Sequence, residues 1–120
     1  METMGNVILK WQGKEYKVTQ ESGMMRMLSV MQDFLPVSTA FKNMADSSTV
    51  NLARYSEAYA AALKVAGCNV SSIQIYKEMI KNSQSISEVV GGVVMIYTAL
   101  HKSNDGEEEE EKKNEKNRIE

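Results

Sequence analysis

The sequence predicts a mainly α-helical protein, with a short N-terminal β-hairpin, a bundle of four or five helices and a disordered acidic C-terminal tail. Three observations predict this class. Apolar residues alternate near the N-terminus, they recur at helical spacing from residue 20 onward, and residues 103–120 hold one aliphatic side chain and no aromatic one. A chain of 120 residues with 42% hydrophobic and 25% charged residues is typical of one domain. We therefore expect a helical domain over residues 1–102, with its hairpin over 6–18, and a charged tail over 103–120.

The hairpin is predicted over residues 7–18. Apolar side chains alternate along VILKW and again along KEYKV, and Gly13 between them can adopt the positive φ that a tight turn needs. A lone hairpin is marginally stable in water, so one face must pack on the rest of the chain. Trp11 and Tyr16 are the expected contacts.

A first helix is predicted after residue 20, and Pro36 either closes it or kinks it. Its inward stripe has the spacing i, i+3, i+4, i+7 and consists of Met24, Met27, Leu28, Met31 and Leu35. A shorter segment from about Ser38 to Ala45 is expected to continue it. The polar cluster at residues 46–49 then predicts a turn and the start of the next helix.

The clearest helical pattern follows, and Gly67 ends it. Its stripe is Leu52, Tyr55, Tyr59, Ala62, Leu63 and Ala66.

Two capping-box patterns, at residues 71–74 and 85–88, predict the starts of two further helices. The expected inward stripes are Ile73, Tyr76, Met79 and Ile80 in the first, and Ile86, Val89, Val90, Val93, Ile96, Tyr97 and Leu100 in the second. Gly91 and Gly92 lie inside the second stripe. Because each costs about 1 kcal/mol relative to alanine within a helix, the pair predicts either the close approach of another helix or a kink.

The net charge of −2 is unevenly distributed along the chain. Residues 1–104 carry ten basic and eight acidic side chains, whereas residues 105–120 carry four and eight. The acidic run either keeps the protein soluble or recruits a partner. The N-terminus lacks the pattern of a secretory signal, and the apolar run 89–100 is shorter than the roughly 20 residues that span a bilayer. We expect a cytoplasmic protein with no membrane partner.

The folded part is poor in groups that could act together as base and nucleophile, so we do not expect an enzyme. His101 and Cys68 are the only histidine and cysteine, and we interpret them as a surface imidazole and a small buried apolar side chain. No residues have metal-ligand or phosphate-loop spacing, so neither a metal nor a cofactor is expected. The lysines are scattered, which argues against nucleic acid as a partner.

The candidate partner-binding residues are methionines, which adapt to irregular apolar partners. They are Met24, Met25, Met27, Met31 and Met44. Three of them share the inward stripe of the first helix, which favours a role in the core. Met25 lies off that stripe and is the best candidate for an exposed contact.

Three features in this order, the segment WQGKEYKVT at residues 11–19, the segment AAALKVAG at 60–67 and the charged end, resemble the tail assembly chaperones of long-tailed bacteriophages. The resemblance covers most of residues 6–102. It implies a non-enzymatic chaperone that coats the helical tape measure protein in the host cytoplasm and helps recruit tail tube subunits. Such families commonly make a longer product by ribosomal frameshifting, and EKKN at residues 111–114 permits the adenine run on which a ribosome slips.

Other functions stay open on the sequence alone. The main alternative is a small helical structural or adaptor protein, either a virion component or an oligomerising interaction module. A homo-oligomer is compatible with both hypotheses. A small DNA-binding regulator carries less weight, and salt-dependent retention on duplex DNA would support it.

Overall fold

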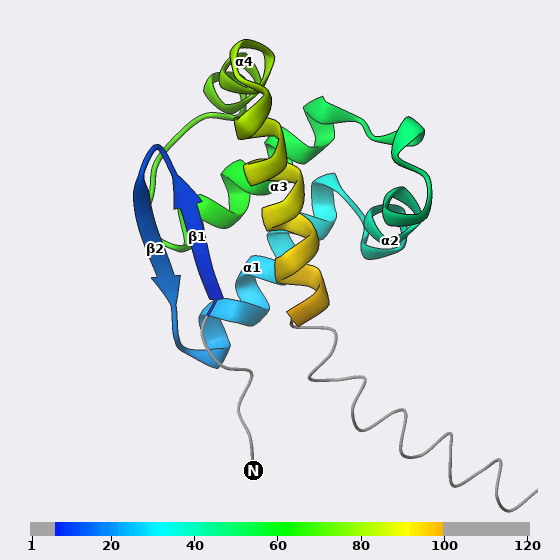
Figure 1. The fold of residues 1–120 in the computed structure, drawn as a ribbon. Coiled ribbons are helices and arrows are strands. Elements are labelled where there is room, and N and C mark those ends of the chain that lie inside the picture. The colour runs from blue at the N-terminus through cyan, green and yellow to red at the C-terminus, as the bar shows by residue number, and fades with distance from the viewer. Residues whose placement is uncertain (1–6, 100–120) are drawn as a thin grey trace, which may run out of the picture.

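The computed structural model describes residues 7–99 and has the predicted class, an antiparallel two-stranded hairpin followed by five α-helices and one short 3-10 helix within this range (Figure 1). In chain order the elements are β1 (Val7–Trp11), β2 (Lys14–Val18), α1 (Glu21–Phe34), α2 (Val37–Ala45), the short 3-10 helix η1 (Ser47–Thr49), α3 (Leu52–Val65), α4 (Ser72–Lys81) and a final helix over residues 83–99. Within residues 7–99, no helix has both the length and the apolar character needed to cross a bilayer. Leu100, His101 and the predicted tail lie outside the described residues.

The hairpin turn uses two residues with positive φ. Gln12 has φ 51° and Gly13 has φ 80°, the combination that a two-residue type I′ turn requires. Trp11 pairs with Lys14 across this turn. One face of the hairpin is buried through Val7, Leu9, Trp11 and Val18, with Tyr16 partly buried. The predicted packing of this face through Trp11 and Tyr16 is therefore confirmed.

Pro36 separates two helices. α1 ends at Phe34, and α2 is a distinct helix with Pro36 as its N-cap, because the residue before a proline avoids the helical region. The inward stripe of α1 is confirmed, since Met24, Met27, Met31 and Leu35 are buried and Leu28 is half-buried.

The ends of α3 are defined by side-chain and backbone caps. The Asn51 carboxamide oxygen accepts from the N–H groups of the second and third residues that follow it, so α3 starts after the polar cluster at 46–49 rather than within it. At the other end Gly67 has φ 101°. The Cys68 N–H donates to the Leu63 carbonyl at 2.7 Å and the Gly67 N–H donates to the Lys64 carbonyl at 3.1 Å, which is a Schellman motif. Gly67 ends the helix as predicted.

α4 begins as predicted, but its buried face differs from the predicted one. Ser71 and Gln74 form the capping box, whereas the buried residues are Ile75 and Met79. The exposed residues are Ile73 (65%), Tyr76 (40%) and Ile80 (62%). Apolar side chains lie on several sides of this short helix, so spacing alone could not select the inward one.

The final helix starts earlier than predicted. The Asn82 carboxamide oxygen accepts from the Gln84 N–H at 3.0 Å, and Ser85 is buried, so the predicted cap at residues 85–88 is wrong. The helix continues through both glycines. A Cβ at Gly92 would lie 2.7 Å from Tyr59 Cε1, whereas one at Gly91 would meet nothing within 4 Å. Gly92 therefore allows the close approach of α3, and no kink is needed.

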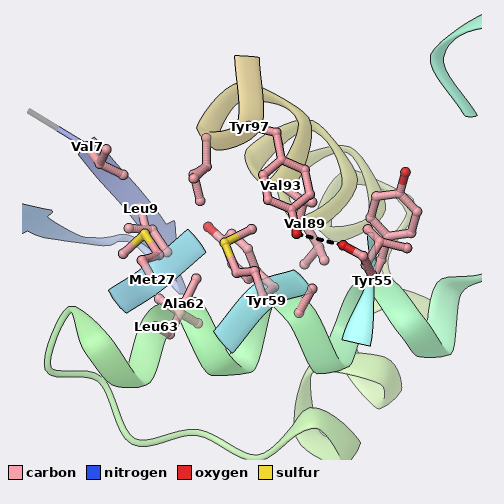
Figure 2. Packing of buried hydrophobic residues seen from close by; sticks show 14 of the residues in the cluster. Val7, Leu9, Met27, Tyr55, Tyr59, Ala62, Leu63, Val89, Val93 and Tyr97 are labelled. Carbon is pink, nitrogen blue, oxygen red and sulfur yellow. Dashed lines mark hydrogen bonds between the residues drawn. The ribbon is translucent and has the colours of Figure 1, made fainter. Parts of the chain in front are cut away.

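Three tyrosines whose side chains are drawn in Figure 2 use their hydroxyls to join distant segments across the core. Tyr59 donates to the Lys10 carbonyl at 2.6 Å and accepts from the Lys10 N–H at 3.1 Å. Tyr97 donates to the Leu35 carbonyl at 2.6 Å, and Tyr55 donates to the Asn43 side-chain oxygen at 3.0 Å. Burial raises the pKa of Tyr59 to about 12 and raises the pKa of Tyr97 as well. These rings therefore stay neutral donors at physiological pH.

Candidate functional site

The five candidate methionines do not gather on one surface. Met24, Met27 and Met31 are at most 1% exposed and belong to the core. Met25 and Met44 are 53% and 59% exposed on different helices, α1 and α2. The interpretation of Met25 as an exposed residue is confirmed, while a binding role for it stays a prediction. Cys68 is half-buried against the core. The pKa of the Tyr16 hydroxyl is raised, first by its hydrogen bond with Cys68 and second by desolvation.

A groove of about 640 Å³ lies along the outer face of α3. α3 forms its floor, α1 forms one wall, and residues 69–72, which lead into α4, form the other. Its lining residues are Arg26, Val30, Asp33 and Phe34 from α1, Glu57, Ala60, Ala61, Lys64 and Val65 from α3, and Asn69, Val70, Ser71 and Ser72. We call this the α3 groove.

A smaller hollow of about 270 Å³ extends the α3 groove toward the start of α3. Both share Glu57 and Ser72, and the extension adds Ala53 and Ser56 from α3 and the exposed Ile73 and Tyr76 from α4. From Ala53 to Val65 the floor spans thirteen residues, or about 18 Å for the twelve steps of 1.5 Å between them. This length matches about three turns of a second helix.

Small side chains on the floor of the α3 groove leave room for a helix to approach closely. Ala53, Ala60 and Ala61 lie on the side of α3 that is turned away from its buried tyrosines. Alanine at such positions lets a neighbouring backbone approach closely, and the walls supply larger apolar surfaces at Val30 and Phe34. The site therefore combines a flat floor with apolar sides, which suits the apolar face of an amphipathic helix.

α1 and α3 run in opposite directions across each other (Figure 1). Met27, in the first half of α1, lies beside Leu63 near the end of α3 (Figure 2). The Leu35 carbonyl, just beyond α1, accepts from Tyr97, which interacts electrostatically with Tyr55 near the start of α3. The beginning of α1 is therefore next to the end of α3, and the end of α1 is next to the beginning of α3.

This arrangement separates the charges that line the α3 groove. Arg26 and Asp33 on α1 are seven residues apart, as are Glu57 and Lys64 on α3, a distance of about 10 Å along each helix. The opposite directions place the two basic side chains at one end and the two acidic ones at the other. Glu57 also forms an exposed ion pair with Arg54 at 3.8 Å, which contributes little in solvent.

Comparisons of the chain with protein-family models, curated proteins and solved structures give no match. Function is therefore inferred from the surface itself. Over residues 7–99 no group of three or more His, Cys, Asp or Glu side chains is placed to hold a metal ion.

The α3 groove was missed by sequence reasoning because its parts come from three separate segments. The signal that could have found it is the pair of apolar residues Ile73 and Tyr76, which the stripe of α4 assigned to the core. The outward alanines at residues 60 and 61 belong to the segment AAALKVAG and lie outside the apolar stripe of α3.

Proposed function

We propose that the protein is a non-enzymatic assembly chaperone that holds an amphipathic helix of its partner in the α3 groove. The groove itself carries this proposal, because it is about 18 Å long, floored by alanines and walled by apolar side chains. Helix-in-groove recognition uses such a surface to cover the apolar face of a partner that would otherwise aggregate.

The resemblance to tail assembly chaperones supports the tape measure protein as this partner, the tail tube protein as the subunit recruited next, and the host cytoplasm as the location. A long helical partner offers many similar apolar faces in succession. Many copies bound along one such partner need little affinity each, because linked sites raise the effective concentration. A groove of three helical turns is in keeping with this weak, repeated binding.

Co-expression with a tape measure protein tests the proposal. Ala61 is half-buried in the groove floor, whereas Ala45 is exposed at the end of α2, so Ala61→Gln and Ala45→Gln form a matched pair. We expect the wild type and Ala45→Gln to keep the partner soluble and to co-purify with it, and Ala61→Gln to lose both effects while keeping its melting temperature. The proposal is contradicted if the partner is equally soluble with the wild type and both variants. It is also contradicted if the partner is as soluble alone as with the wild type.

One observation favours the alternative of an oligomerising structural or adaptor protein. A second hollow of about 630 Å³ is lined by apolar residues and serines without any charged side chain, at Ser47, Val50, Leu52, Ile86, Ser87, Val90 and Gly91. Met95, one helical turn beyond Gly91, is 67% exposed. Under this alternative the mass in solution is that of a closed oligomer, Met95→Lys reduces it to a monomer, and Ala61→Gln has no effect on partner binding.

A further inference from the structure

We infer that the α3 groove binds its helix in one direction, with the partner's N-terminus at the Asp33 and Glu57 end and its C-terminus at the Arg26 and Lys64 end. This inference rests on the proposed function, which requires only that a helix binds there. The direction follows from the separation of charge along the groove.

The dipole of the bound helix selects this direction. A helix carries a partial positive charge at its N-terminus and a partial negative charge at its C-terminus. Asp33 and Glu57 therefore attract the N-terminal turn, while Arg26 and Lys64 attract the C-terminal turn. In the reverse direction both ends of the bound helix meet like charges.

The same charges define the side chains that the partner helix carries. The segment is about twelve residues long, has alanine or aliphatic residues on one face, and places Lys or Arg in its first turn and Asp or Glu in its last. This order is unfavourable in an isolated helix, where acidic residues prefer the N-terminal turn. A preference for it therefore comes from the groove rather than from the helicity of the ligand.

The four charged residues of the groove are accessible to a ligand. Arg26, Asp33 and Lys64 are exposed and Glu57 is half-buried. Among the described ion pairs only Arg54 with Glu57 involves one of them, at 3.8 Å. Charge pairs at a solvent-exposed rim contribute little each, so the two ends together are expected to change the affinity by about tenfold.

Three stapled helical peptides with one common apolar face test the direction in a fluorescence anisotropy titration against the full chain. The forward peptide begins with lysines and ends with glutamates, the reversed peptide has the opposite order, and the neutral peptide has glutamine at these positions. We expect the forward peptide to bind about tenfold more tightly than the reversed one at low salt, with the neutral peptide between them. The difference is expected to shrink at 0.5 M salt, because salt screens exposed charges.

A charge-exchanged protein supplies the reciprocal test. The variant combines Arg26→Glu, Lys64→Glu, Asp33→Lys and Glu57→Lys, and it is expected to prefer the reversed peptide. Lys42→Glu, on α2 outside the groove, is the control and is expected to keep the wild-type preference. If the exchanged protein fails to fold, the three peptides on the wild type still decide the question.

The outcomes separate the two levels of the proposal. Equal affinity of the forward and reversed peptides overturns the direction and leaves helix binding in place, because the reversed peptide can then bind turned around in the groove. No binding of any peptide overturns both the direction and helix binding. Two other outcomes also overturn the inference. If the forward peptide binds only after residues 100–120 are removed, those residues are the occupant of the groove. If the chain self-associates and all three peptides dissociate it equally well, the occupant is a second copy of the chain.

Discussion

Replacing the adjacent glycines of the final helix by alanine is expected to change stability in opposite directions. Alanine is favoured over glycine inside a helix by about 1 kcal/mol. A Cβ at Gly91 meets no atom within 4 Å, so Gly91→Ala is expected to raise the free energy of unfolding by about 0.5–1 kcal/mol. A Cβ at Gly92 lies 2.7 Å from Tyr59 Cε1 and 3.3 Å from Cζ, which is too close for an undisturbed ring.

The Tyr59 ring has little freedom to move away. Its side chain is 1% exposed, and its hydroxyl holds the Lys10 backbone through bonds of 2.6 and 3.1 Å. Overpacking a tight core costs about 1–3 kcal/mol, which offsets the gain in helix propensity. Gly92→Ala is therefore expected to lower the free energy of unfolding by up to about 2 kcal/mol.

Urea and thermal denaturation followed by circular dichroism measure both variants. In a domain of this size 1 kcal/mol corresponds to a melting-temperature shift of about 4–8 °C, so the two variants should separate clearly. Adding Tyr59→Leu to Gly92→Ala should reduce the cost of the alanine, since the contact is then removed. Equal stabilisation by both alanines would refute the close approach between α3 and the final helix.

Three further stability predictions follow from single contacts. Gln12→Asn is expected to stabilise the hairpin by about 0.5–1 kcal/mol in urea denaturation, because asparagine tolerates the positive φ better, and an unchanged midpoint would contradict the type I′ turn. Ile75→Ser is expected to cost about 2–5 kcal/mol and Ile73→Ser less than about 0.5 kcal/mol, and equal losses would contradict the phase of α4. The raised pKa of Tyr59, about 12 against 10.0, stabilises the protein below pH 10, and this contribution is lost as the pH rises from 10 to 12. Tyr59→Phe should therefore lose less stability over that interval, and an identical alkaline profile would contradict the assignment.

The elements that sequence patterns predicted well are those with only one possible inward face. The apolar stripes of α1 and α3 each repeat at helical spacing along a 14-residue helix, and Gly67 needs a positive φ, so their phase and end could be predicted. α4 differs, because Ile73 and Ile80 lie on one side of the helix and Ile75 and Met79 on another, and only packing against α3 decides which side is buried. Ser56 of α3, whose hydroxyl lies 3.3 Å from the Met79 sulfur, is part of that packing.

The candidate site could be predicted only in part. Methionine content indicated an adaptable surface, yet the stripe that carries Met24, Met27 and Met31 is what the core needs. The α3 groove depends on the relative direction of α1 and α3, which no local pattern specifies. For the same reason the separation of Arg26 and Lys64 from the two acidic residues could not be seen before the helices were placed.

Methyl NMR of the full chain, alone and with the proposed partner, a tape measure protein, tests the central claim most directly. Alanine, isoleucine and methionine methyl groups report on the α3 groove at Ala61 and Ile73, and on the remaining exposed surface at Met25, Met44 and Met95. We expect the partner to shift the Ala61 and Ile73 signals and to leave the three methionine signals unchanged. Shifts at those methionines with Ala61 and Ile73 unaffected would contradict the α3 groove as the binding site.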